Sequence, residues 1–134
     1  MRKINTIYII DDDPILIFGI KKMLSLIVAC DSITHFANGK LALDFILQEY
    51  KENSCVPEVI FLDINMPVMD GWQFLEEFLQ LPIDKKVRIN ILTSSIDATD
   101  RDNWEKYKAK THHTITYNSK PIQKTDLAEI TKVA

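Results

Sequence analysis

VIFLDINMPVMDGW, residues 59–72, places an aspartate directly after a short apolar run. The run VIFL predicts a strand that is buried on both faces, as in a parallel sheet covered by helices. Pro67 and the pair Asp70 and Gly71 then predict a loop. Asp63 is therefore expected at the carboxyl end of a strand, where open α/β sheets bind their ligands.

A second apolar run, IYII at residues 7–10, ends in two more acids, Asp11 and Asp12. In one parallel sheet, these carboxylates and that of Asp63 would share a small volume. At roughly 5 Å and an effective dielectric near 20, each pair repels by about 3 kcal/mol. A fold keeps such a cluster only if a cation fills it. The sequence therefore predicts a metal site and chemistry on a charged substrate.

The remaining sequence alternates strand and helix patterns, with Asp13–Pro14 and Asn38 as helix starts. This alternation requires right-handed crossovers, and it predicts a doubly wound α/β fold with a five-stranded parallel sheet and five helices. The predicted strands are 4–10, 32–36, 58–62, 87–92 and 114–118. The predicted helices are 14 to about 28, 39 to about 51, one containing residues 72–79, 98–108 and 125–132.

Length and composition indicate one soluble domain over residues 1–134, without an output domain. The net charge of −3 and the lack of a basic run with aromatics argue against nucleic acid as a direct partner. Cys30 and Cys55 fit no metal-binding spacing and are expected to be reduced thiols. No signal peptide and no apolar stretch near ~20 residues is found, so a cytoplasmic protein is expected.

The residues around Asp63 narrow the expected chemistry. A carboxylate can attack an activated phosphoryl group and form an aspartyl phosphate. Such a transfer depends on positioning and on neutralising charge, usually with Mg²⁺ and a lysine. Mg²⁺ prefers oxygen ligands and keeps several waters, so Asp11 and Asp12 suffice, and the backbone carbonyl of Asn65 could complete the set.

Two further residues follow predicted strands and are expected at the same edge of the sheet. Thr93 can donate its hydroxyl to a phosphoryl oxygen, and Lys120 brings a compact positive charge. Four of the five predicted strands thus carry a reactive side chain to one place. This arrangement favours phosphoryl transfer.

With these residues, the chain resembles the receiver domain of two-component response regulators, especially the single-domain chemotaxis type. The motifs are IIDDD at 9–13, LDINMPVMDGW at 62–72, LTSS at 92–95 and SKP at 119–121. The resemblance covers the chain from its first strand to its last helix. It implies a flavodoxin-like sheet in the order 2-1-3-4-5 and Mg²⁺-dependent phosphotransfer from a histidine kinase or a phosphotransfer protein.

The resemblance also implies roles for single residues. They are Asp63 as phosphoacceptor, Asp12 as direct metal ligand, Asp11 as a ligand mostly through water, Asn65 as a carbonyl ligand, Thr93 as switching hydroxyl, Tyr117 as switching aromatic and Lys120 as phosphate partner. Asn65 and Ser95 fall where family members tune dephosphorylation, and the Lys120–Pro121 bond is often cis in the family.

The function implied is a phosphorelay switch rather than a classical enzyme, with autocatalytic phosphotransfer and autodephosphorylation. Phosphorylation would change binding of a downstream protein at the face of the fourth helix, fifth strand and fifth helix. Two alternatives stay open. A haloacid-dehalogenase-type phosphatase also forms an aspartyl phosphate, but it needs an acid where this chain has Asn65. A scaffold with the same fold would have lost phosphorylation.

Other residues have simpler explanations. Asp13 is expected to cap a helix, and His112 and His113 to lie on a solvated surface. Trp72 and Trp104 are expected to pack against or cover helix surfaces. Gly19 inside a helix costs about 1 kcal/mol relative to Ala, and it indicates either close packing or a partner surface.

Overall fold

Five parallel strands form one sheet in the order β2-β1-β3-β4-β5 in the computed structural model, which describes residues 2–66, 68–94 and 97–131. The predicted fold class and strand order are confirmed. The strands are β1 (Arg2–Ile10), β2 (Val28–Phe36), β3 (Val59–Asp63), β4 (Arg88–Thr93) and β5 (Thr114–Ser119).

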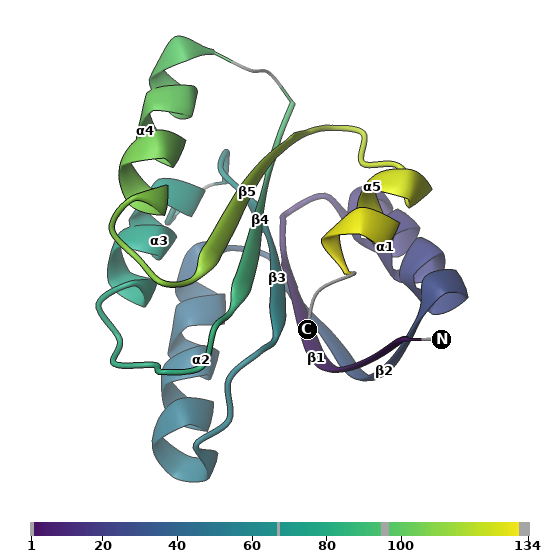
Figure 1. Ribbon diagram of the computed structural model, residues 1–134, viewed down its shortest axis with the longest axis horizontal. Coiled ribbons are helices and arrows are strands. Elements are labelled where there is room, and N and C mark those ends of the chain that lie inside the picture. The colour runs from purple at the N-terminus through teal and green to yellow at the C-terminus, as the bar shows by residue number, and fades with distance from the viewer. Residues whose placement is uncertain (1, 67, 95–96, 132–134) are drawn as a thin grey trace.

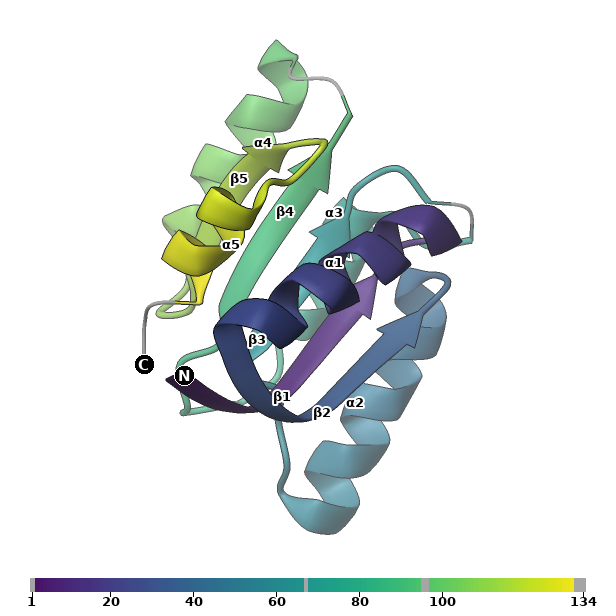
Figure 2. The same ribbon diagram turned by 90° about the vertical axis from the view of Figure 1, so that its right-hand side faces the viewer.

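Helices cover both faces of the sheet, so the fold is doubly wound (Figure 1). One face carries α1 and α5, and the other carries α2, α3 and α4; Figure 2 shows α1 and α5 in front of the sheet. The helices are α1 (Pro14–Ile27), α2 (Gly39–Asn53), α3 (Gly71–Phe78), α4 (Ala98–Lys108) and α5 (Lys124–Ile130).

The sheet separates two apolar cores because successive side chains of a strand point to opposite faces. Along β3, Ile60 and Leu62 pack with α2 and α3, whereas Val59 and Phe61 pack with α1 and α5. All five residues of β3 are buried, as the continuous apolar run predicted.

Polar side chains begin the helices at the expected places. Asp13 accepts hydrogen bonds from the backbone N–H groups of Ile15 and Leu16 at the start of α1, which confirms its capping role. Asn38 caps α2 in the same way. Asp70 and Asp97 cap α3 and α4.

The pairing of β1 with β2 is longer than predicted. The sequence placed the start of the second strand at Ser32, but Val28 already has an extended backbone (φ −135°, ψ 152°), and α1 passes into β2 without a loop. The pairs Arg2 with Val28 and Lys3 with Ala29 extend the ladder. Both strands lengthen together because each supplies backbone partners for the other.

The two adjacent histidines have different environments. His112 is exposed as predicted, but the prediction was wrong for His113, which is 5% exposed. The Nδ1 atom of His113 accepts a hydrogen bond from the backbone N–H of Val87 at 2.9 Å, and its ring packs on Phe78. A backbone partner and an aromatic neighbour stabilise a polar ring that the local sequence placed in solvent.

Some predictions fall outside the described residues. These are the loop residue Pro67, the tuning position Ser95 and the helix end at Lys132. The last helix is described as far as Ile130.

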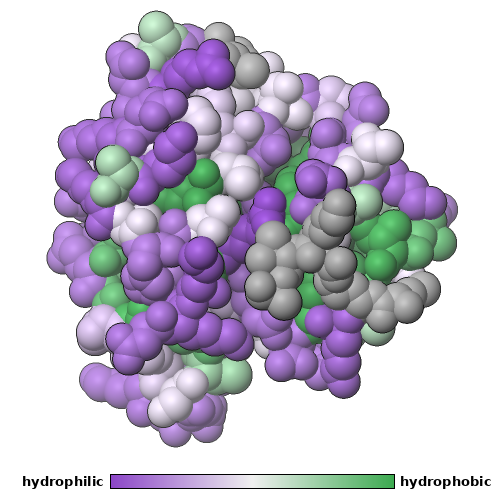
Figure 3. All heavy atoms as spheres, viewed as in Figure 1, coloured by the Kyte–Doolittle hydropathy of each residue, from purple (hydrophilic) through white to green (hydrophobic). Residues whose placement is uncertain are grey.

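Apolar side chains gather on the outside of α1, which lies at the right of Figure 3, whereas the surface over α4 is mainly hydrophilic. Ile15, Phe18 and Leu26 are the most exposed of these α1 side chains. Cys30 and Cys55 are free thiols. Within the described residues, no helix combines the length and the apolar character needed to cross a bilayer.

Candidate functional site

The sheet brings two acid-bearing strand ends side by side. Strands β1 and β3 are neighbours, and Ile10 pairs with Leu62, so the next residues, Asp11 just after β1 and Asp63 at the end of β3, lie at the same level. Asp12 follows on the loop to α1. Carboxylate oxygens of the three acids lie within 4.8 Å of one another. This cluster, Asp11, Asp12 and Asp63, is called the acid cluster below.

The acid cluster is partly withdrawn from solvent. Asp11 and Asp63 are 0% and 3% exposed, while Asp12 is exposed. Burial raises the pKa of Asp11. Burial, followed by repulsion from Asp11, raises the pKa of Asp63. Both shifts express the cost of holding two carboxylates in a poorly solvated space.

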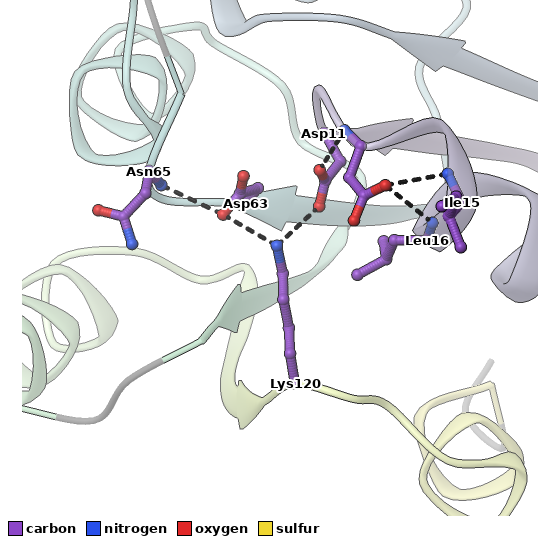
Figure 4. A network of polar contacts seen from close by, with 7 residues as sticks. Asp11, Ile15, Leu16, Asp63, Asn65 and Lys120 are labelled. Carbon is purple, nitrogen blue, oxygen red and sulfur yellow. Dashed lines mark hydrogen bonds and ion pairs between the residues drawn. The ribbon is translucent and has the colours of Figure 1, made fainter.

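Lys120 lies between the two buried carboxylates (Figure 4). Its Nζ atom is 3.1 Å from Asp11 Oδ2 and 3.4 Å from Asp63 Oδ1. Burial acts to lower the pKa of Lys120, but attraction to Asp11 and Asp63 outweighs it, so the pKa is raised. The lysine therefore stays charged and offsets part of the repulsion in the acid cluster.

The backbone holds the lysine in place. The N–H of Lys120 donates to the carbonyl of Thr93 at 2.7 Å, directly after β5, and the Lys120–Pro121 peptide bond is cis. Thr93 ends β4, pairs with Ser119 and is 0% exposed. The ends of β4 and β5 thus place Thr93 and Lys120 at the edge of the sheet that carries the acid cluster.

Backbone N–H groups orient the carboxylates. Asp11 Oδ1 accepts from the N–H of Asp13 at 2.8 Å, and Asp63 Oδ1 accepts from the N–H of Asn65 at 3.2 Å (Figure 4). Asp11 Oδ2 is buried, and its close neighbour is the ammonium of Lys120 at 3.1 Å. Buried carboxylate oxygens are normally satisfied by donors or cations. Here Lys120 is the cation beside Asp11 Oδ2, but three carboxylates around one ammonium leave an excess of negative charge, which fits a divalent cation.

Tyr117 lies further back on β5, paired with Ile91. Its ring stacks on Trp104 of α4 with centroids 5.7 Å apart, and its hydroxyl is buried without a hydrogen-bond partner. Burial, together with the charges of Asp100 and Asp97, raises the pKa of Tyr117. The predicted switch aromatic thus faces α4 and lies away from the Lys120 ion pairs.

Gly71 supports the site in a way that sequence reasoning missed. A Cβ on Gly71 would lie 2.7 Å from the carbonyl oxygen of Asp63 and 2.7 Å from the Cα of Ile64. The first residue of α3 therefore packs directly on the backbone that carries Asp63. Asp70 with Gly71 predicted a loop, but the close approach depends on contacts between segments that the local pattern does not contain.

The sequence matches the response regulator receiver domain family over residues 7–132. An uncharacterized response regulatory protein of Vibrio cholerae is 32% identical over 129 residues, which cover 96% of this chain and 44% of that protein. The chain thus spans less than half the length of this curated relative.

Solved structures agree with the sequence match. A two-component response regulator from Cytophaga hutchinsonii is 28% identical, with a TM-score of 0.83 and coverage of 98% of this chain and 96% of that one. The receiver domain of the sensor histidine kinase PA1611 from Pseudomonas aeruginosa, solved with a magnesium ion in its active site cleft, has the same fold (23% identity, TM-score 0.70, coverage 93% and 92%). By sequence and by fold, the chain belongs to the response regulator receiver domains of two-component signalling.

Proposed function

We propose that this receiver domain is a phosphorylation-controlled switch in which Asp63 accepts the phosphoryl group. The observation that carries the proposal is the pair of contacts from Lys120 Nζ to Asp11 and Asp63 beside the acid cluster. A lysine held between a potential nucleophile and a potential metal ligand suits phosphoryl transfer, in which charge on the transferred oxygens must be neutralised.

Mg²⁺ is the proposed cofactor. Asp11, Asp12, Asp63 and the backbone carbonyl of Asn65 would hold it, because a cluster of carboxylate oxygens suits a hard cation that keeps several waters. The three carboxylates outnumber the ammonium of Lys120 beside them, and this excess of negative charge supports a cation at this place. Bound there, the ion would neutralise charge on the phosphoryl oxygens.

The protein's own residues would then perform the transfer. A carboxylate oxygen of Asp63 attacks phosphorus and forms the new P–O bond, while the bond from phosphorus to the imidazole nitrogen of the donor breaks and the imidazole leaves with its electron pair. The ammonium of Lys120 pairs with one phosphoryl oxygen, and the hydroxyl of Thr93 donates to another. The raised pKa of Lys120 keeps that charge in place.

The donor would be a histidine kinase or a histidine phosphotransfer protein, and the product state would bind a downstream protein differently. We place the responding surface on α4, β5 and α5, because β4 and β5 connect Thr93 and Tyr117 to it. Only a partner that distinguishes the two states can respond. Residues 1–134 would act as a receiver domain in the cytoplasm, where a kinase domain has access to ATP.

The test is incubation with acetyl phosphate and Mg²⁺, followed by mass spectrometry. We expect one phosphoryl group per chain, labile to hydroxylamine and absent from Asp63→Asn. Asp31→Asn is the matched control because Asp31 is an exposed acid on β2, and it should keep full labelling. Rapid multiple turnover of a small phosphate ester would instead support a phosphatase, and no labelling of the wild type would support the scaffold alternative.

A further inference from the structure

Helix α4 contacts the rest of the domain through an unusual inner face. Among its eleven residues, Tyr107 is the buried one. Asp100, Trp104 and Tyr107 follow the spacing i, i+4 and i+7, which puts them on one side of the helix. An ordinary helix in this position would bury several aliphatic side chains. In this helix, one carboxylate and two aromatic rings make contacts with α3 and β5.

Trp104 joins α4 to β5 through two contacts. Its ring stacks on Tyr117 at a centroid distance of 5.7 Å and an interplanar angle of 17°, and its Nε1–H donates to the carbonyl of Ile115 at 2.9 Å. The ammonium of Lys108 lies 4.0 Å from the Trp104 ring centroid. These contacts fix the indole, so the Tyr117 ring cannot change its orientation without disturbing Trp104.

Trp72 joins the same helix to α3. Its Nε1–H donates to Asp100 Oδ1 at 3.1 Å, and its ring stacks on Tyr107 at 5.9 Å with an angle of 11°. Figure 1 shows α4 standing beside both α3 and β5. A displacement of α4 caused at the β5 side must therefore change the surroundings of Trp72.

Tyr117 itself is poorly satisfied in this arrangement. Its hydroxyl is buried without a hydrogen-bond partner. An unpartnered buried hydroxyl is costly, and the stack on Trp104 is a favourable contact that opposes reorientation of the ring. The stack on Trp104 is thus one of the contacts that hold the ring, beside its packing on the apolar core, and it makes the position of the ring sensitive to Trp104.

We infer that Trp104 is a positioning residue that couples the orientation of the Tyr117 ring to the position of α4. Phosphorylation at Asp63 would then change the surroundings of Trp72 through a movement of α4. This inference rests on the proposed function, in which Tyr117 responds to phosphorylation. It assigns the coupling between Tyr117 and α4 to Trp104, which belongs neither to the acid cluster nor to the ion pairs of Lys120. It also predicts that α4 moves as one body between its contacts with β5 and α3.

The chain holds two tryptophans, one at each contact, and this makes a direct test possible. Protein labelled with 5-fluorotryptophan should give two ¹⁹F resonances, which Trp72→Phe and Trp104→Phe assign. On phosphorylation with acetyl phosphate and Mg²⁺, we expect both resonances to shift in the wild type. Neither should shift in Asp63→Asn under the same conditions.

The decisive variant is Trp104→Leu, which removes the stack and leaves Trp72 as the reporter. We expect phosphorylation to leave the Trp72 resonance unmoved in this variant, whereas Trp104→Phe, which keeps an aromatic ring against Tyr117, should restore the shift. Circular dichroism checks that Trp104→Leu is folded; if it is not, Tyr117→Leu replaces it with the same expectation.

Mass spectrometry of the same samples separates the two proposals. Absence of a phosphoryl group in the wild type would overturn the proposed function. Full phosphorylation with an equal Trp72 shift in the wild type and in Trp104→Leu would overturn the role of Trp104 while leaving phosphorylation intact. A wild type that is phosphorylated without any shift of Trp72 would overturn the movement of α4 as one body.

Discussion

At the carboxyl end of the sheet, Asp11 and Asp63 are buried beside Lys120, whereas at the amino end His113 is buried against Phe78 and a backbone N–H. The first group combines two buried carboxylates with the ammonium of Lys120. The second is a neutral ring that accepts one hydrogen bond. The buried carboxylates of Asp11 and Asp63 lie beside a cation, the ammonium of Lys120. At the amino end, burial favours the neutral form of the His113 ring.

The amino end offers the largest expected effect. Burial, with a smaller effect from His112, lowers the pKa of His113 to about 4 from an ordinary value of 6.5. As the pH falls, His113 therefore takes up a proton at a higher pH in the unfolded chain than in the folded protein. Stability from this residue is fully present above pH 6.5 and is lost progressively down to about pH 4.

His113→Asn keeps an acceptor for the Val87 N–H but cannot titrate. Between pH 7 and pH 5, we expect the wild type to lose about 2 kcal/mol of unfolding free energy that the variant keeps. Urea denaturation at both pH values measures this difference. His35→Asn, at an exposed position, is the control. Identical pH dependence of His113→Asn and wild type would mean that the buried ring is not held neutral.

The carboxyl end should respond to a cation instead. If Mg²⁺ binds the folded acid cluster as proposed, Mg²⁺ at ten times its dissociation constant is expected to raise the unfolding free energy by about 1.4 kcal/mol. Thermal denaturation with MgCl₂, compared with NaCl of equal ionic strength, measures the effect. Asp12→Asn removes one exposed carboxylate of the acid cluster, a proposed ligand, and should reduce the stabilisation by MgCl₂. Equal stabilisation by both salts would argue for general screening in place of a metal site.

These two ends also differ in how far the sequence revealed them. Asp11 and Asp63 follow apolar strand runs and Lys120 follows the predicted fifth strand, and in a parallel sheet every strand end of one kind lies at one edge. Their proximity could therefore be predicted from local patterns and the fold class. Their roles were inferred from the motifs and remain predictions until Asp63 is tested.

Contacts between distant segments could not be predicted in this way. The burial of His113 depends on Val87 and Phe78, and the closeness of Gly71 to Asp63 depends on how α3 enters the domain. Trp104 belongs to a polar helix, so nothing local indicated its stack on Tyr117. Long-range packing decides such positions, and one sequence shows only the residue types.

Backbone strain gives a last, smaller contrast between the ends. Val68, in the loop after Asp63, has φ 72°, and Ser54, at the end of α2 before β3, has φ 52°. The left-handed region costs roughly 1–2 kcal/mol for an ordinary residue, and more crowding is expected for a β-branched side chain. Val68 is 79% exposed, so its side chain contributes little packing to offset this cost.

Val68→Gly should therefore stabilise the domain by about 0.5–1 kcal/mol, since relief of strain exceeds the added entropy of an unfolded glycine. Ser54→Gly is the matched change at the opposite end, and it should gain less because serine is not β-branched. Chemical denaturation of both variants compares them directly. If Val68→Gly does not raise the unfolding free energy, the loop beside Asp63 carries no more backbone strain than an ordinary helix end. The two ends of the sheet then differ in their charges alone.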